Sequence, residues 1–275
     1  MSYKINTLIK SDKVVVSYEK RLSICLTSNG FSFSITTVHD DLLAIGDVAC
    51  NLDVAMSDLM TSVKNVFADS GIATYGLKEA ELVVDSSRFV WVPQSLYDEK
   101  QQRTYLDAVC KIENGQGVYV DYNDAIKAYI VFSAPSALVS AFKIAIPGLK
   151  VRCQHDKMVN AIMVGHSDLK SLLLINLRDK ESDYAVFCNK KLQLSNTFRC
   201  ESYDDAIYHA LNLTKQLHLE EAPLTTAVCG AIDRERFGQL LQFFPNVALY
   251  TGRQLTLTEP EMQHVPLYKY ALILS

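Results

Sequence analysis

Two short turns in this sequence carry residues that could bind a phosphate group or a divalent cation. Thr27, Ser28, Asn29 and Gly30 of the first turn could donate hydrogen bonds to an anion. A carboxylate pair in the second turn, Asp179 and Glu181, could hold a metal ion. The simpler interpretation is two hairpin turns, where Asn, Gly, Asp and Ser are favoured for conformational reasons. The candidate positions are Thr27, Ser28, Asn29 and Gly30 in the first turn and Asn176, Arg178 and Asp179 in the second.

The composition limits the classes of protein and ligand to consider. The chain has 275 residues, of which 49% are hydrophobic and 21% charged, which is typical of a soluble globular protein with two domains or one large one. The net charge is −4 and no Lys/Arg-rich run occurs, which argues against a dedicated nucleic-acid binder.

The N-terminal sequence, the hydropathy and the cysteines indicate the cellular compartment. The N-terminus lacks the pattern of a signal peptide, and no apolar run reaches the ~18 residues of a membrane helix. The seven cysteines are scattered and never form C-x-x-C, as expected for reduced thiols. We therefore expect a cytoplasmic protein without membrane insertion.

The first turn lies within a predicted series of three strands, a helix and a further strand. Asn29-Gly30 is a strong hairpin signal between two apolar strands. The helix follows from apolar residues at helical spacing, namely Met56, Leu59, Met60, Val63, Val66 and Phe67. The predicted elements are, in order, 22–28, 31–37, 41–50, the helix at 54–67, and 81–85.

The second turn lies within a series of the same order. Ser202 and Asp205 predict a capping box at the start of its helix, which should bury Ile207, Ala210, Leu211, Thr214 and Leu217. Cys25 and Asn176 are 151 residues apart, and Leu82 and Thr226 are 144 apart, so the two series keep nearly one offset. The predicted strands are 171–177, 183–188, 191–198 and 225–232.

The sequence therefore predicts a duplicated βββαβ α/β protein. Between the two series, the pattern indicates a strand, a helix at 138–146, a strand at 149–154 and a short helix at 157–164. The predicted domains are a first subdomain at 1–116, an intervening α/β segment at 117–165 and a second subdomain at 166–275.

A tandem βββαβ unit resembles the actin-like ATPase (ribonuclease H-like) superfamily, which includes sugar kinases, chaperone ATPases and bacterial pilus-assembly proteins. Residues 171–199 are similar to the second phosphate meander of its pilus-assembly and secretion-scaffold branch. FVWVPQSLYDEKQQRTYLD at 89–107 and LLLINLRDKESDYAVFCNKKLQLSNTF resemble an uncharacterised bacterial family, a domain of unknown function. The resemblance covers essentially the whole chain and implies two similar halves with a cleft between them.

The resemblance also implies where a nucleotide site would lie. In active members each meander begins with Asp-x-Gly, whose Asp positions Mg²⁺ or water and whose Gly admits phosphate to the backbone. Here Cys25 and Thr27 take those places in the first meander, and Asn176 and Arg178 in the second. The adenosine-side glycine pair is reduced to Gly230. The implied nucleotide-loop positions are therefore degenerate.

Other possible sites are weaker. Cys153-Gln154-His155 resembles half of a metal site, with Cys200 or His209 as further ligands, but no second pair occurs at zinc spacing. Residues 165–168 contain the letters of a catalytic triad without the G-x-S-x-G elbow, which favours a turn.

Two apolar or aromatic segments could be contact surfaces or parts of the core. The aromatic one contains Phe89, Trp91, Tyr97, Tyr105, Tyr119, Tyr122 and Tyr129. Strand packing is the favoured interpretation, and an interface is the alternative. The stretch 97–103 predicts a solvated helix start. Residues 265–274 predict a terminal strand docked in a sheet, the alternative being an exposed strand for a partner.

The sequence thus predicts a pseudo-ATPase: a catalytically degenerate actin-like protein that acts as a protein-binding scaffold or adaptor. We expect another protein as its partner, no nucleic acid, no metal and no cofactor. The alternative is a divergent ATPase or small-molecule kinase that binds ATP and Mg²⁺ and uses Asp179 or Glu181. A homodimeric structural protein is the third possibility.

Overall fold

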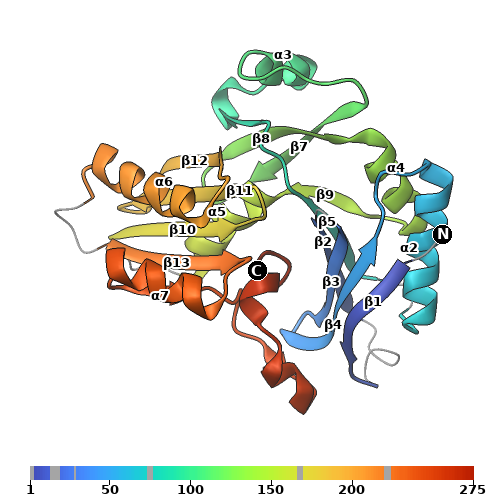
Figure 1. Cartoon of the computed structure of the whole chain (residues 1–275). Helices are drawn as coiled ribbons and strands as arrows, with labels where there is room; N and C mark the ends of the chain where they lie inside the picture. The colour runs from blue at the N-terminus through green and yellow to red at the C-terminus, as the bar shows by residue number, and fades with distance from the viewer. Residues whose placement is uncertain (1–2, 13–18, 28, 73–76, 166–169, 220–223) are drawn as a thin grey trace. The chain divides into compact units, whose positions relative to one another are not determined.

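The computed structural model describes residues 3–12, 19–27, 29–72, 77–165, 170–219 and 224–275, shown in Figure 1. The chain forms two compact units. Unit 1 consists of residues 1–122, 127–154 and 254–265. Unit 2 consists of residues 123–126, 155–253 and 266–275. The segment 117–165 is therefore shared, with 117–122 and 127–154 in unit 1 and 123–126 and 155–165 in unit 2.

Unit 1 is built on a mixed sheet with the strand order β1-β4-β3-β2-β5-β9, and β15 pairs with β4. The strands from β1 to β2 in this order are antiparallel, whereas β5 and β9 are parallel to β2. The strand bounds are Tyr3–Lys10 (β1), Lys20–Thr27 (β2), Gly30–Thr37 (β3), Asp41–Cys50 (β4), Glu79–Val84 (β5), Lys150–Cys153 (β9) and Thr256–Leu257 (β15).

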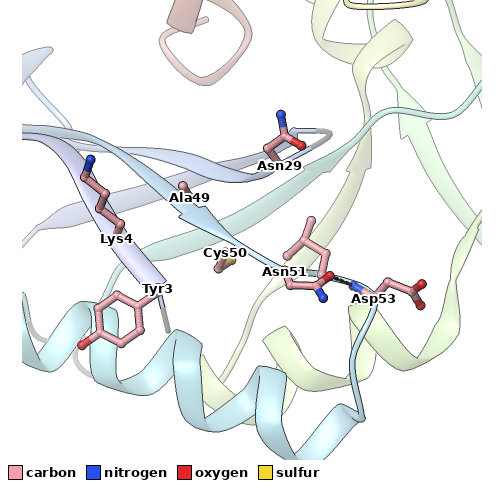
Figure 2. A pocket seen from close by; sticks show the side chains of 8 residues that line it. Tyr3, Lys4, Asn29, Ala49, Cys50, Asn51 and Asp53 are labelled. Carbon is pink, nitrogen blue, oxygen red and sulfur yellow. Dashed lines mark hydrogen bonds between the residues drawn. The ribbon is translucent and has the colours of Figure 1, made fainter. Parts of the chain in front are cut away.

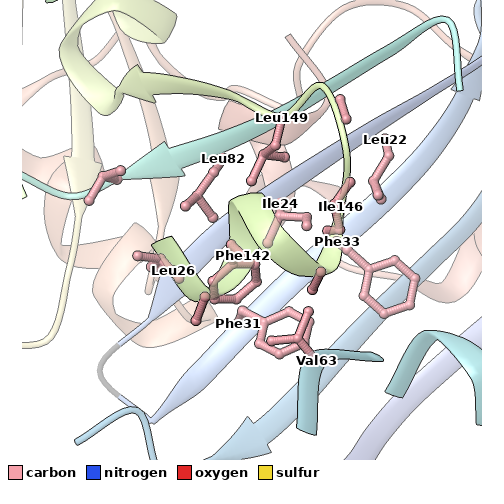
Figure 3. Packing of buried hydrophobic residues seen from close by; sticks show 14 of the residues in the cluster. Leu22, Ile24, Leu26, Phe31, Phe33, Val63, Leu82, Phe142, Ile146 and Leu149 are labelled. Carbon is pink, nitrogen blue, oxygen red and sulfur yellow. The ribbon is translucent and has the colours of Figure 1, made fainter. Parts of the chain in front are cut away.

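Helices α2 (Met56–Asp69) and α4 (Ser136–Ala145) pack with this sheet in one apolar core. Alternate residues of β2 and β3 point into it, and Figure 3 shows Phe31 beside Phe142, with Phe33 in the same cluster. The rings of Phe31 and Phe142 are edge to face, with centroids 5.4 Å apart. The predicted helical face is largely correct, but Met56 is 43% exposed because it lies at the first position of α2.

A smaller sheet in unit 1 has the order β6-β8-β7 and carries the aromatic segment. The ring centroids of Tyr97 and Tyr129 are 3.7 Å apart, and those of Tyr122 and Tyr129 are 4.9 Å apart. These three tyrosines therefore pack on one another, and each remains half-buried. The elements are β6 (Phe89–Pro93), η1 (Gln94–Leu96), η2 (Glu99–Gln101), α3 (Gln102–Asp107), β7 (Gln116–Asn123) and β8 (Ala128–Pro135).

Unit 2 is built on a five-stranded sheet with the order β12-β11-β10-β13-β14. On β12, Leu194 and Phe198 pack into the core that holds α6, whereas Ser195 contacts His155 of α5. Because alternate residues of a strand face opposite sides, α5 and α6 cover opposite faces of this sheet. The elements are α5 (Gln154–Gly165), β10 (Ser171–Leu177), β11 (Glu181–Cys188), β12 (Lys191–Arg199), α6 (Tyr203–Gln216), β13 (Leu224–Gly230), α7 (Arg234–Phe243) and β14 (Val247–Leu249).

Helix α6 begins with the predicted capping box. The Ser202 hydroxyl accepts from the Asp205 N–H, and the Asp205 carboxylate accepts from the Ser202 N–H. Ile207, Ala210 and Thr214 are buried as predicted. Leu211 and Leu217 are only half-buried, whereas Ala206 and Leu213, which were not predicted, are buried on the inner face of α6.

The duplication is confirmed by the topology. The order β4-β3-β2-β5 in unit 1 matches β12-β11-β10-β13 in unit 2. In each unit the first three strands of the repeat are antiparallel, and the strand after the helix is parallel to the first. The predicted fold class, a duplicated βββαβ α/β protein, is correct.

The C-terminal segment is not the predicted strand. It forms the 3₁₀ helix η4 (Leu267–Ile273), which follows the shorter η3 (Pro260–His264). Residues Tyr270 to Ile273 are nonetheless buried, and η4 packs against β13. Strand β13 already has β10 on one edge and β14 on the other, so it offers no edge for a further strand. The 3₁₀ helix η4 buries the apolar residues that the predicted strand was expected to bury.

Across the described ranges, no helix is both long enough and apolar enough to cross a membrane.

We expect Phe33→Ala to lower the free energy of unfolding of unit 1 by about 3–5 kcal/mol, because it leaves a cavity. The Phe33 side chain is fully buried, and its ring centroid lies 5.3 Å from that of Phe67. Leu96→Ala is the control, since Leu96 is 69% exposed and should change the free energy by less than about 0.5 kcal/mol. Urea denaturation followed by circular dichroism measures both. Equal midpoints for the two variants would show that the core is misassigned.

Candidate functional site

Both predicted turns are two-residue hairpin connections, and they occupy equivalent places in the two units. In unit 1, Thr27 pairs with Gly30 at the end of the hairpin. In unit 2, the N–H of Arg178 donates to the carbonyl oxygen of Glu181 at 3.0 Å, which closes the turn over residues 179–180. Thr27 and Arg178 therefore hold corresponding positions.

The residues two places earlier in each hairpin correspond as well. Cys25 of β2 lies opposite Ser32 of β3, and Asn176 of β10 lies opposite Asp183 of β11. In both hairpins the two residues that face each other are seven positions apart in the sequence. The structure therefore supports the sequence-based pairing of Cys25 with Asn176, and it adds a cross-strand partner for each.

The first turn is held against β4. Gly30 has φ +148°, and a Cβ at this position would collide with the carbonyl oxygen of Val48. The carbonyl oxygen of Asn29 accepts from the N–H of Cys50 at 3.0 Å. Gly30 therefore serves the close approach of two backbone segments. Ser28, between the two strands, lies outside the described residues.

An open hollow of about 630 Å³ lies beside this turn, and Asn29 is the predicted residue that lines it (Figure 2). Lys4, Asn51 and Asp53 contribute further polar side chains. The N–H of Asp53 donates to Asn51 Oδ1 at 2.9 Å, so part of this polar rim is a local turn. Burial raises the pKa of the Cys50 thiol in the wall, which keeps it protonated. The hollow thus offers polar groups and no activated nucleophile.

In the second turn, the Arg178 side chain folds back onto Asp183. Its Nε donates to Asp183 Oδ2 at 2.9 Å and its Nη2 to Oδ1 at 2.8 Å, which is a bidentate ion pair. Its Nη1 lies 2.9 Å from Glu181 Oε2. The guanidinium is thereby bound to two carboxylates of the same hairpin.

Asn176 belongs to the same network. Its Nδ2 donates to Asp183 Oδ2 at 2.9 Å, and its Oδ1 accepts from the Cys229 thiol at 3.6 Å. Gly230 follows in β13 with φ +86°, and a Cβ there would collide with the carbonyl oxygen of Leu177 and crowd Asn176 Oδ1. Gly230 is therefore required for β13 to approach β10, independent of any ligand.

Asp183 is the centre of these contacts. Its side chain has no exposure to solvent, and it also accepts from Thr197 Oγ1 at 2.6 Å. Burial, the largest single influence, raises the pKa of this carboxyl, but the charges of Arg178 and His155 and the hydrogen bonds from Arg178 and Thr197 together outweigh it and hold the pKa below the usual range. Asp183 is therefore an anion at neutral pH.

His155 extends the network toward α5. Its Nε2 lies 2.8 Å from Thr197 Oγ1, and its Nδ1 lies 2.8 Å from Ser195 Oγ. Thr197 gives its single hydroxyl proton to Asp183, so it must accept from Nε2–H, and Nδ1 then accepts from Ser195. Burial lowers the pKa of His155 to about 4, with Asp183 opposing the shift. The ring is therefore neutral and protonated at Nε2.

This arrangement does not fit a bound Mg²⁺ ion. A hard cation needs carboxylate oxygens with free lone pairs. Both oxygens of Asp183 already accept hydrogen bonds from Arg178, and they also serve Asn176 and Thr197. Within the part of the chain that the structure describes, no group of three or more His, Cys, Asp or Glu side chains could hold a metal.

The predicted positions separate into those the structure brings together and those it does not. Asn176, Arg178 and Gly230 meet in unit 2, whereas Asp179 is exposed at the tip of the second turn. Thr27, Asn29 and Gly30 belong to the first turn, in unit 1. Residues 166–168, with the triad letters, lie outside the described residues.

Sequence reasoning missed Asp183, Thr197 and His155. Asp183 could have been found, because a two-residue turn after Arg178 places it opposite Asn176. His155 could not, since it comes from a helix that reaches the sheet only in the folded protein. His155 was instead considered, and discounted, as half of a metal site, and it bonds two hydroxyl groups.

We expect the stability of unit 2 to fall as the pH drops from 6.5 to 4. The unfolded imidazole gains a proton below its usual pKa of 6.5, whereas the folded one stays neutral until about pH 4. The unfolded state thus binds more protons in this window, and the loss reaches about 3 kcal/mol.

Urea denaturation of wild type and His155→Gln at several pH values between 7.5 and 4 measures this effect. Glutamine keeps hydrogen-bonding capacity for the two hydroxyl groups and does not titrate, so its pH dependence should be flatter. Parallel curves for the two proteins would exclude His155 as the source.

Comparisons with known proteins agree with this architecture. A Bacteroides thetaiotaomicron protein of unknown function with an actin-like ATPase fold superposes with a TM-score of 0.73 at 21% identity, over 87% of this chain and 93% of that chain. A chain of the PilM-PilN type IV pilus biogenesis complex superposes with a TM-score of 0.56 at 10% identity, over 94% and 98%. At these identities the similarity shows the fold alone, and it is the actin-like ATPase fold.

Sequence comparison supplies the family. No curated protein matches the chain significantly. Residues 10–247 match the family model described as "Protein of unknown function (DUF3822)", which spans most of the 275 residues. The chain therefore belongs to the DUF3822 family.

Proposed function

We propose that this protein is a catalytically degenerate actin-like protein that acts as a protein-binding scaffold or adaptor. The observation that carries the proposal is the buried ion pair between Arg178 and Asp183 in the second turn. It removes both the carboxylate and the open backbone that a nucleotide-binding turn would need.

Phosphoryl transfer depends on a positioned metal ion and on compensating charge rather than on covalent steps by the protein. In the second turn, the carboxylate of Asp183 is bound by Arg178, Asn176 and Thr197. In the first turn, Ser32 holds the position of Asp183, and Cys25 holds the position of Asn176, with its thiol donating to the carbonyl oxygen of Leu26 at 3.5 Å. Neither hairpin presents a free carboxylate at the position that would orient a metal.

A protein partner is supported at the level of the fold. The PilM-PilN complex contains a chain of similar fold, so this architecture can serve in a protein assembly. In unit 1, Leu96 is 69% exposed, and its carbonyl oxygen accepts a hydrogen bond from the hydroxyl of Tyr105, whose ring stacks with that of Tyr97. Exposed apolar residues beside tyrosines are typical of protein contact surfaces.

The alternative is a divergent Mg²⁺-dependent ATPase or small-molecule kinase. Asp179 is the observation in its favour, because this carboxylate is exposed at the tip of the second turn. Glu181 is a poorer candidate, since Arg178 binds it at 2.9 Å.

We expect calorimetric titration of the wild-type protein with millimolar ATP, with and without Mg²⁺, to give no binding heat. We expect no thermal stabilisation under the same conditions, because neither hairpin presents a free carboxylate at the position that would orient a metal. Tight Mg²⁺-dependent binding with ATP turnover would contradict the proposal. In that case Asp179→Asn decides the role of Asp179: loss of turnover would assign the reaction to it, and an unchanged rate would exclude it.

Sedimentation at several protein concentrations tests the third possibility, a homodimeric structural protein. A monomer at every concentration supports an adaptor that needs a different protein as partner.

A further inference from the structure

We propose that Arg178 is a built-in counter-ion that takes the place of a divalent cation, so that the second turn is a latent metal site. Asp183, rather than Asn176, then carries the negative charge of this turn. The inference rests on the proposed function in taking the native turn as closed to Mg²⁺–nucleotide. It goes further by assigning to Arg178 the place of a divalent cation and by naming the class of ion that the turn would accept once the guanidinium is removed.

The first step is the burial of Asp183. Its side chain has no exposure to solvent, and it lies between Asn176, Thr197 and Arg178. An isolated buried carboxylate is strongly destabilising, so it requires a cation or a proton. His155 cannot supply the charge, because it is neutral and its Nε2 lies 3.6 Å from Asp183 Oδ1.

The second step is the position of the cation. Arg178 reaches Asp183 from the end of the same strand as Asn176, and its side chain is 17% exposed. The guanidinium therefore lies between a buried carboxylate and the solvent. An ion entering from solvent would meet the same carboxylate from the same side once the guanidinium is removed.

The third step is the chemistry of the groups around the guanidinium. Asp183 and Glu181 bind it with carboxylate oxygens, and the Thr197 hydroxyl donates a hydrogen bond to Asp183 Oδ1. Asn176 turns its Nδ2 toward Asp183 and its Oδ1 toward the Cys229 thiol, so the two carboxylates supply the oxygen donors that contact the guanidinium. Oxygen donors of this kind are preferred by Mg²⁺ and Mn²⁺, with water completing the coordination.

Unit 1 shows the neutral counterpart. Opposite Cys25 stands Ser32 instead of a carboxylate, and the position of Arg178 is taken by Thr27. A cation is present where the cross-strand partner is an anion, and absent where the partner is neutral. This correspondence is what a counter-ion role for Arg178 predicts.

The test is Arg178→Gly, which removes the guanidinium and restores backbone access at the turn. Thermal and urea unfolding are measured with 0–10 mM MgCl₂ or MnCl₂ against NaCl of matched ionic strength. We expect the wild type to respond equally to all three salts. For the variant, the ratio of folded to unfolded protein should rise about tenfold when the ion reaches ten times its dissociation constant. Direct binding is measured by calorimetry with the metal chloride alone.

Two further variants make the result decisive. Arg178→Gln keeps side-chain volume without charge and should show the same response to divalent ions. Arg178→Gly combined with Asp183→Asn removes the anion and should abolish that response. The proposal is overturned if neither Arg178 variant is stabilised by Mg²⁺ or Mn²⁺, including the case in which both stay unfolded at every ion concentration. It is also overturned if the response persists in the double variant.

These outcomes are separable from those of the proposed function. Binding of ATP and Mg²⁺ by the wild type would overturn the scaffold proposal, whatever the Arg178 variants do. Absence of ion binding in the Arg178 variants would overturn the counter-ion role and leave the wild-type calorimetry unchanged.

Discussion

A carboxylate without solvent exposure requires a cation or a proton next to it. For Asp183, this requirement determines the hydrogen bonds and ion pair of the second turn in unit 2. Arg178 satisfies it with a bidentate ion pair, and Asn176 and Thr197 complete the hydrogen bonding. The charge of Asp183 also affects His155. Because Thr197 donates its hydroxyl proton to Asp183, it must accept from His155 Nε2–H, which fixes the tautomer of His155. One buried charge thus determines the state of a turn, a strand and the start of a helix.

The duplicated frame explains how two similar hairpins reach different states. Both have a two-residue turn and the same cross-strand spacing, so their side chains occupy matching places. In unit 1 the pair is Cys25 and Ser32, and the turn is fixed by the contact of Gly30 with β4. In unit 2 the pair is Asn176 and Asp183, and the turn is fixed by Arg178. The two units thus share the backbone arrangement of the hairpin but differ in the contacts that stabilise its turn.

The fold was largely predictable from the sequence because its signals are local. Strand β10 has the predicted bounds, the Asn29-Gly30 hairpin follows from turn chemistry, and the Ser202 capping box is present. The C-terminal segment was assigned wrongly, since its apolar pattern does not reveal that both edges of β13 are occupied. The degenerate positions Asn176 and Arg178 were identified, but their partners depend on tertiary contacts. His155 and Thr197 are 42 residues apart and meet only in the folded unit.

The central claim is that Arg178 and Asp183 stabilise unit 2 as a pair, and a double-mutant cycle measures this most directly. The free energy of unfolding is compared for wild type, Arg178→Met, Asp183→Asn and the double variant. Removing one partner of a buried ion pair costs about 3–5 kcal/mol of unfolding free energy. We therefore expect the loss in the double variant to be smaller than the summed losses of the two single variants, by at least about 2 kcal/mol. Additivity within about 0.5 kcal/mol would contradict the account, because it would mean that the two side chains act independently.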